Sequence, residues 1–308
     1  MNSFHTSVLL KETIDFLQVK KGEQYIDATL GGGGHTREIL SRGGIVLGID
    51  CDEEAIEYVR KNLEFRIPRP RQAKRGGQNS ELTLTKGNFK NLEEIAHSNN
   101  FNKVKGIIFD LGVSSYQLEN GKRGFSFLKG GPLDMRMDKE LGVKASDLLN
   151  ILSKGELYEI FIKLGQEHRS RAISSSIVSA RRVAPIQTTG DLSGVIQKAI
   201  GIKGEITDFT KAQISKRVFQ ALRIAVNDEL ENIKIALPKT LNLLESGARV
   251  AVISFHSLED RIVKQSFIDF QKRNMGKIIT KKPVTAGKEE IGSNPRSRSA
   301  KLRVFEKN

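Results

Sequence analysis

The chain has 308 residues, of which 50 are Lys or Arg and 36 are Asp or Glu, so its formal charge is +14. This length excludes a peptide-sized scaffold. The single cysteine, Cys51, excludes an internal disulfide framework, a cysteine-based zinc site and an iron–sulfur cluster. The sequence contains no apolar signal segment and no run of about 18 uncharged apolar residues, so we expect a cytoplasmic protein without a membrane span. The positive charge favours a polyanionic partner, nucleic acid before an anionic membrane surface.

Short β-branched runs alternate with amphipathic helical segments in the first half of the chain, which is typical of βα units around a parallel sheet. We expect strands at residues 24–29, 45–49, 82–85 and 104–109, and helices at 36–41 and 53–63. Residues 66–77 include five basic side chains and no acid, and two prolines and two glycines interrupt any regular element. This segment is predicted to be an exposed basic loop.

The pattern changes after Gly112. An irregular stretch at 121–142 is followed by helical segments near 145–152, 156–164, 169–182 and 191–200, with no strand pattern between them. The α/β pattern then returns with a long helix at 215–244, interrupted or kinked at Pro238, a strand at 248–254, a helix from 258 and a short strand at 302–305. We therefore predict an α/β domain formed by residues 1–117 and 213–308, with an inserted helical domain at 118–212.

The strongest chemical signal is the segment YIDATLGGGGH at residues 25–35, a predicted strand that leads through a glycine-rich turn into a helix. Glycines let the backbone approach a ligand, and the helix supplies free N–H groups. The second strand ends in Asp50, nineteen residues after Gly31, the spacing of a carboxylate that binds ribose hydroxyls. Together these features indicate a nucleoside cofactor.

S-adenosylmethionine fits this loop better than NAD does. Thr36 replaces the third glycine of the dinucleotide fingerprint, and Asp27 would repel a pyrophosphate but could reach the amino end of a methionine moiety. Two alternatives remain open: an NAD-dependent oxidoreductase on the same fold, and a non-catalytic RNA-binding or ribosome-assembly protein. The histidines show no paired metal-ligand spacing and no dense carboxylate cluster occurs, so no metal site is expected.

Further candidate residues lie at or just beyond the ends of later strands. Phe89 could flank an adenine or could be an ordinary core residue, and Asp110 could orient an amine for methylation or cap a turn. His256 is consistent both with an RNA pocket and with a structural role. Ser257 and Asp260 are predicted to form a helix capping box.

The sequence resembles the MraW/RsmH family of bacterial S-adenosylmethionine-dependent methyltransferases in several blocks. These are HTSVLL at 5–10, GGGGH at 31–35, DLGVSS at 110–115, RGFSF at 123–127, GPLDMRMD at 131–138, FQALRI at 219–224, ISFHSLEDR at 253–261 and NPRSRS at 294–299. The resemblance implies a Rossmann-like class I methyltransferase with an inserted all-helical substrate-recognition domain. It also implies methyl transfer to the exocyclic N4 amine of a specific cytosine in the decoding region (P site) of 16S rRNA, with the small ribosomal subunit as partner. Independently of the resemblance, a homodimer is possible.

The resemblance also implies a set of site residues. It assigns cofactor binding to Gly33, Gly34, His35, Asp50, Phe89, Asp110 and Gln117. We predict Asp110 as the catalytic residue, because an acceptor must hold the weakly nucleophilic amine of the cytosine in a reactive orientation. Phe125, Phe127 and Arg136 could form part of the pocket for the base, although core packing is the alternative for the two phenylalanines.

Overall fold

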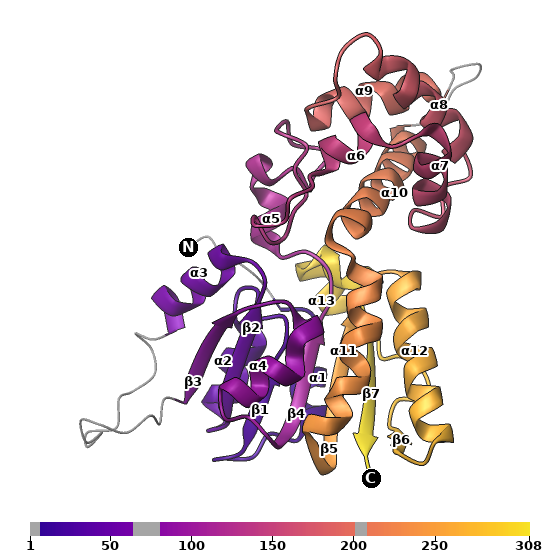
Figure 1. The fold of residues 1–308 in the computed structure, drawn as a ribbon. Helices are drawn as coiled ribbons and strands as arrows, with labels where there is room; N and C mark the ends of the chain where they lie inside the picture. Colours follow the sequence, from indigo (N-terminus) through magenta and orange to yellow (C-terminus); the bar gives the residue numbers. More distant parts are fainter. Residues whose placement is uncertain (1–6, 64–80, 201–207) are drawn as a thin grey trace. The chain divides into compact units, whose positions relative to one another are not determined.

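The computed structural model describes residues 7–63, 81–200 and 208–308, and the basic loop predicted at 66–77 lies outside them. The chain divides into two compact units. One consists of Met1–Ser114 and Leu230–Asn308, and the other of Ser115–Glu229 (Figure 1). Within the described ranges, no helix combines the length and apolar character needed to cross a bilayer.

A seven-stranded sheet forms the centre of the first unit, with the strand order β3-β2-β1-β4-β5-β7-β6. The strands are β1 (Gln24–Asp27), β2 (Ile45–Asp50), β3 (Leu82–Lys86), β4 (Val104–Asp110), β5 (Leu244–Ser254), β6 (Gly276–Ile278) and β7 (Lys301–Lys307). The first five are parallel, and β7 runs antiparallel between β5 and β6. The strand order reverses between β1 and β4, where doubly wound sheets bind ligands. The predicted Rossmann-like α/β fold is confirmed.

Both faces of the sheet are apolar because helices cover both. Successive residues of a strand point to opposite faces, so Tyr25 and Ile108 belong to one buried cluster and Ile26 and Ile107 to the other. The first face is covered by α1 (Leu10–Leu17), α2 (Gly34–Ser41) and α3 (Glu53–Leu63), and the second by α4 (Leu92–Ser98), α11 (Glu229–Leu243) and α12 (Ser257–Lys272) (Figure 1). Shorter elements of this unit are η1 (Phe89–Asn91), α13 (Lys288–Ser293) and η3 (Pro295–Ser299).

Helices make up the regular structure described in the second unit. They are α5 (Ser115–Glu119), η2 (Gly121–Arg123), α6 (Ala145–Ile151), α7 (Lys154–Lys163), α8 (Ser170–Arg181), α9 (Thr189–Ala199) and α10 (Asp208–Asn227). α8 packs against both α7 and α9, and α10 packs against α6, α7 and α9. Phe161, Ile177 and Val218 are fully buried between them. Because α10 packs with these helices, the boundary between the units follows Glu229, whereas the sequence placed a boundary at 212/213.

The long helix predicted at 215–244 is two helices, and its interruption lies at Asp228 instead of Pro238. Asp228 has a φ of 55°, in the left-handed region, which ends α10. Arg223 donates two hydrogen bonds, of 2.8 and 2.9 Å, to the carboxylate of Glu229 across this turn. Pro238 lies inside α11, which continues through it. Polar side chains around a left-handed residue therefore mark the break, a signal weaker in sequence than a proline.

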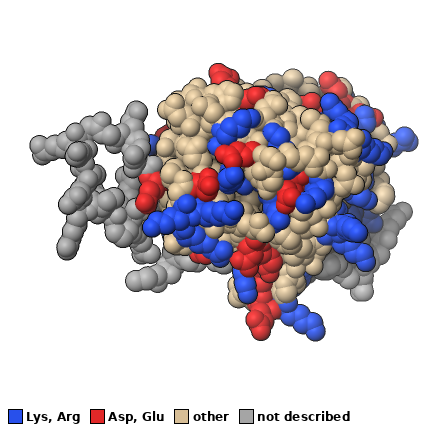
Figure 2. Space-filling model, turned by 90° about the horizontal axis from the view of Figure 1, so that it is seen from below, with Lys and Arg blue, Asp and Glu red and all other residues tan. Residues whose placement is uncertain are grey.

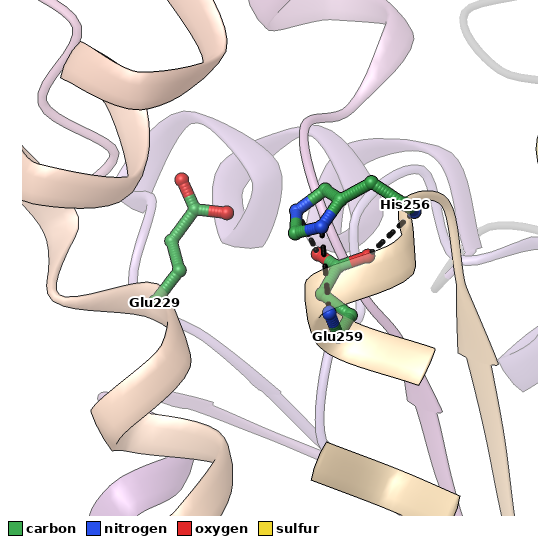
Figure 3. Close-up of side chains that lie close together, drawn as sticks. All are labelled: Glu229, His256 and Glu259. Carbon is green, nitrogen blue, oxygen red and sulfur yellow. Dashed lines mark hydrogen bonds and ion pairs between the residues drawn. The ribbon is translucent and has the colours of Figure 1, made fainter. Parts of the chain in front are cut away.

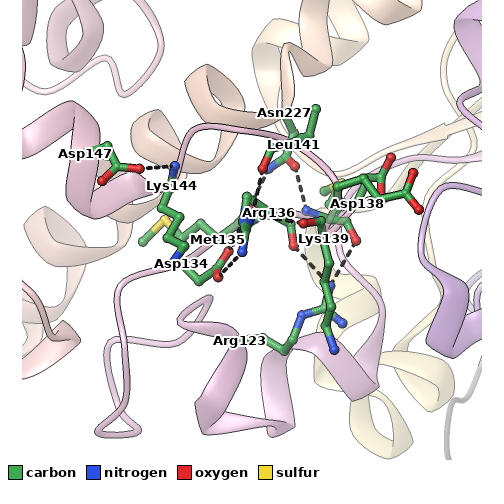
Figure 4. Close-up of polar contacts among 12 residues, drawn as sticks. Arg123, Asp134, Met135, Arg136, Asp138, Lys139, Leu141, Lys144, Asp147 and Asn227 are labelled. Atoms are coloured by element: carbon green, nitrogen blue, oxygen red, sulfur yellow. Dashed lines mark hydrogen bonds and ion pairs between the residues drawn. The ribbon is translucent and has the colours of Figure 1, made fainter.

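The backbone around Met135 in the second unit is held by side chains from distant segments. Met135 is buried and has a φ of 62°, which is unfavourable for a residue with a Cβ. Arg123 donates to the carbonyl oxygens of Arg136 and Met137 at 3.0 and 2.9 Å. The Asn227 amide donates to the Met135 carbonyl and accepts from the Met137 N–H, both at 2.7 Å (Figure 4). These bonds offset the strain in the backbone.

The Asn227→Ala substitution should lower the free energy of unfolding by about 2–4 kcal/mol, because it leaves the Met135 carbonyl and the Met137 N–H without these partners. Urea denaturation followed by circular dichroism measures this change. As a control, Asn62→Ala removes one exposed hydrogen bond to the Tyr58 carbonyl and should cost less than about 0.5 kcal/mol. Equally small losses of unfolding free energy in both variants would show that the hydrogen bonds of Asn227 do not stabilise the fold.

Candidate cofactor-binding and active site

The glycine-rich loop joins β1 to α2 at the C-terminal edge of the parallel strands. Gly31 and Gly33 have φ values of 49° and 74°, which glycine adopts at little cost. Gly33 is the N-cap of α2, so Gly34 and His35 lie in the first turn, where helix N–H groups have no intrahelical acceptor. A Cβ on Gly34 would lie 1.8 Å from the Ser7 hydroxyl oxygen. Gly34 is therefore required by its close packing on Ser7, while the N–H groups of the first helical turn are of the kind that binds polar ligands at helix N-termini.

Asp50 and Asp27 end adjacent strands and tie the loop to the sheet. Asp50 accepts a hydrogen bond of 2.8 Å from the Gly31 N–H. Asp27 is 1% exposed, and its two oxygens accept from the Thr36 hydroxyl at 2.7 Å and from the Thr29 N–H at 3.3 Å. Both oxygens of Asp27 thus accept hydrogen bonds from residues that flank the loop, so this side chain supports the loop. The sequence had instead suggested a contact with the methionine part of the cofactor.

Burial raises the pKa of Asp27 and the pKa of Asp50, each from 3.8 to about 6. The hydrogen bonds that each carboxylate accepts act in the opposite direction and limit the rise. Because these folded-state values exceed the unfolded ones, the folded protein binds more protons between about pH 4 and pH 6. Their contribution to the stability of the free protein is present at low pH and is lost as the pH rises through about 6.

Asp110 ends β4, and its carboxylate accepts fewer hydrogen bonds than those of Asp27 and Asp50 among the described residues. Its N–H donates to the Thr29 hydroxyl at 2.6 Å, and its Oδ2 lies 3.8 Å from Nδ1 of His35. Its Oδ1 is buried and accepts no hydrogen bond within the described part of the chain. Burial raises the pKa of Asp110 well above its usual value, and the negative charges of Asp27 and Glu259 raise it further. Burial therefore favours the protonated form of Asp110, and one of its oxygens is available to a ligand.

His256 and Glu259 form the cap of α12, beyond the end of β5 (Figure 3). The Glu259 N–H donates to Nδ1 of His256 at 3.4 Å, and the Glu259 carboxylate accepts from the His256 N–H at 3.2 Å. The capping box predicted for Ser257 and Asp260 is therefore wrong by one residue. Asp260 pairs with Arg303 instead, at 2.6 Å. Glu259 was not predicted from the sequence, because the usual signal of such a cap has Ser or Thr, and not His, three residues before the Glu.

Phe89 follows β3 and packs edge-to-face on Phe109, with ring centroids 5.6 Å apart. It is only partly buried, so its ring combines a core contact with an accessible part. Gln117 lies on α5, in the second unit, and is buried there. The structure thus gathers the glycine loop, Asp50 and Asp110 along the sheet edge of the first unit, whereas Gln117 belongs to the helical unit.

Phe125, Phe127 and Arg136 make contacts within the helical unit. The guanidinium of Arg136 donates twice to the Asp134 carboxylate, both at 2.8 Å, and also to two backbone carbonyls of the same loop. Phe127 packs edge-to-face on Phe219, with centroids 5.8 Å apart, and Phe125 is 6% exposed. These contacts are those of a packed, hydrogen-bonded loop, so core packing accounts for the two phenylalanines.

These groups fit S-adenosylmethionine, which supplies an electrophilic methyl group when bound. Asp50 uses one acceptor site on Gly31 and another on Asp52, at 2.8 and 2.9 Å, which leaves acceptor capacity for ribose hydroxyls. Backbone of the glycine loop and the face of Phe89 would hold the rest of the nucleoside. The buried negative charges of this edge would stabilise a sulfonium cation.

The affinity for S-adenosylmethionine should fall as the pH falls through about 6, because Asp50 must be ionised to accept from two ribose hydroxyls and its pKa in the free protein is about 6. We expect the Kd measured by isothermal titration calorimetry to rise about tenfold between pH 7.5 and pH 5. The Asp50→Asn variant should bind weakly at both pH values and show a smaller change. An unchanged pH dependence in that variant would exclude Asp50 as the titrating group.

Comparison with known proteins gives the family. The model of the MraW methylase family matches residues 2–308. Two relatives named ribosomal RNA small subunit methyltransferase H, from Halothermothrix orenii and Clostridium botulinum, are 43% and 42% identical to this chain, over 98% of it and 98% of each relative. A solved methyltransferase structure from Streptococcus mutans, in complex with SAH, is 14% identical, with a TM-score of 0.43 over 98% of this chain and 99% of that one. Because the family match spans nearly every residue, the chain belongs to the MraW methylase family of S-adenosylmethionine-dependent methyltransferases.

Proposed function

We propose that this methyltransferase acts on the exocyclic N4 amine of a specific cytosine in the decoding region (P site) of 16S rRNA. The relatives that are 42–43% identical over nearly the whole chain are named small-subunit ribosomal RNA methyltransferases, which supports this class of substrate. The formal charge of +14 favours a polyanion. On the face drawn in Figure 2, basic side chains are interspersed with acidic ones, so the charge there is spread and forms no single stripe.

The observation that carries the proposal is the free oxygen of Asp110. The amine of a cytosine is a poor nucleophile because its lone pair is delocalised into the ring. An acceptor that holds one N–H fixes the orientation of the amine. The Oδ1 of Asp110 is buried and has no hydrogen-bond partner among the described residues. Asp110 itself ends β4, the strand next to β1, which leads into the glycine loop. It is therefore suited to receive an amine N–H.

The proposed reaction balances with Asp110 as the proton acceptor. The N4–methyl bond forms as the sulfur–methyl bond breaks, and the amine must then lose one proton. Asp110 can take this proton only in its ionised form, which is a stronger base because the pKa of Asp110 is raised. His35, whose Nδ1 is 3.8 Å from Oδ2, lies beside the other oxygen of the carboxylate. We also propose that Gln117 contacts the cofactor and that the helical segment at 118–212 recognises the substrate.

Replacement of Asp110 tests its role directly. The Asp110→Asn variant keeps the shape of the side chain but cannot accept the proton, so we expect its single-turnover rate to fall at least about 100-fold at saturating RNA and cofactor. Cofactor affinity should change much less than the rate. A rate within about threefold of the wild type would remove Asp110 from the mechanism.

The Glu259→Gln variant is the matched control. Glutamine can keep the cap of α12 but removes one of the charges that raise the pKa of Asp110. The rate of the wild type should rise with pH as Asp110 ionises. In Glu259→Gln the same rise should occur at lower pH, because the pKa of Asp110 is lower there. An unmoved profile would show that Asp110 does not set the pH dependence.

The substrate is tested by transfer of labelled methyl groups to small ribosomal subunits, or to their RNA, from a strain without this gene. Mass analysis of the nucleosides should find N4-methylcytidine. If the cofactor binds but RNA stays unlabelled, the proposed substrate is wrong and the methyltransferase assignment stands. RNA binding without any transfer, under conditions in which the cofactor is also bound, would favour an assembly factor.

A further inference from the structure

An open cavity of about 200 Å³ lies on the helical unit and is lined by Lys154, Gly155, Tyr158 and Arg171. Three of these residues belong to α7 and the fourth to α8, two helices that pack against each other (Figure 1). All four residues are far in sequence from the glycine loop and from Asp110. The cavity is smaller than the roughly 300–1,000 Å³ of typical small-molecule sites, so it suits one planar group better than a whole cofactor.

Helix periodicity places the side chains that line this cavity. Ser153 caps α7 through a hydrogen bond of 3.2 Å from the Glu156 N–H, so Lys154 lies in the first helical turn. Tyr158 follows four residues later on the same face, while Leu157 beside it is buried in the core. Tyr158 is partly exposed. The cavity wall on α7 is therefore a cation one turn before an aromatic ring.

The two cations of the cavity have no protein partners within the described residues. Lys154 and Arg171 are exposed, and neither side chain forms an ion pair or a hydrogen bond in that part of the chain. Lys163, at the other end of α7, shows the contrast because it pairs with Glu159 at 2.7 Å. Two unpaired cations beside a tyrosine ring match the chemistry of a nucleotide, which has a phosphate on either side of a base with a π face.

We propose that this cavity binds one unpaired nucleotide of the RNA substrate, with its base against Tyr158 and its flanking phosphates at Lys154 and Arg171. The proposal rests on the proposed function and adds to it a contact site away from the methyl-transfer centre. Single-stranded RNA presents unstacked bases to aromatic side chains in this way. An anionic membrane would use the cations but would leave the ring and its cavity without a role.

The test measures binding of unmethylated small-subunit RNA, without cofactor, as a function of salt concentration. Tyr158→Leu should weaken binding at least about fivefold because stacking is lost, and Tyr158→Phe should stay within about twofold of the wild type. Lys154→Gln and Arg171→Gln should each weaken binding and reduce the slope of log K against log salt by about 0.7. Lys163→Gln is the charge-matched control on the same helix, and its slope should not change.

Cofactor affinity, measured on every variant, separates local effects from misfolding. Equal losses of RNA affinity in Lys163→Gln and Arg171→Gln would show that these cations act only through general electrostatic attraction. Unchanged RNA binding in Tyr158→Leu would show that no base contacts Tyr158. Either result overturns the proposal that the cavity binds a nucleotide. The proposed function would still stand if the wild type transfers methyl groups to the RNA. Binding of anionic phospholipid vesicles that is lost in the variants, with RNA binding unaffected, would assign the cavity to a membrane surface and also overturn the proposal.

Discussion

Three buried carboxylates at one edge of the sheet are the constraint on which the site depends. Asp27, Asp50 and Asp110 end strands that lie side by side, and burial removes most of the hydration that an exposed carboxylate keeps. Asp27 and Asp50 recover part of this loss through hydrogen bonds from the glycine loop, so the loop and the buried charges stabilise each other. Asp110 recovers less because its Oδ1 has no such partner in the described chain. Burial thus opposes ionisation of all three groups, and a sulfonium-bearing ligand would favour their ionised forms.

Basic residues in the helical unit fall into two groups that only the structure separates. Arg123 and Arg136 donate to backbone carbonyls or to an adjacent carboxylate and hold a strained loop in place. Lys154 and Arg171 make no such contacts among the described residues and project around a cavity. Net charge counts all four equally, yet the first pair stabilises the unit, while the second pair is available to a polyanion.

The fold and the site were predictable to different extents. The four strands of the first half and the glycine loop were predictable because runs of β-branched residues and the spacing of glycines are local patterns. The helix break was misplaced, because the left-handed Asp228, next to the Arg223–Glu229 ion pair, leaves no mark in the sequence as strong as Pro238. The cap of α12 was misplaced by one residue, because His256 is an unusual N-cap that works here through Nδ1. Glu259 escaped notice because its effect on Asp110 depends on two strand ends lying side by side, which a single sequence does not reveal.

The position of β7 constrains the order in which the first unit can fold during synthesis. β7 pairs with both β5 and β6, so β6 has no place in the sheet until residues 301–307 have been made. Until then the nascent chain presents β5 as an open edge, and such edges invite wrong pairing between chains. The ion pair between Arg303 and Asp260 can form only at the same late step. Chaperones that shield β5 should therefore influence how much of the protein reaches its native state.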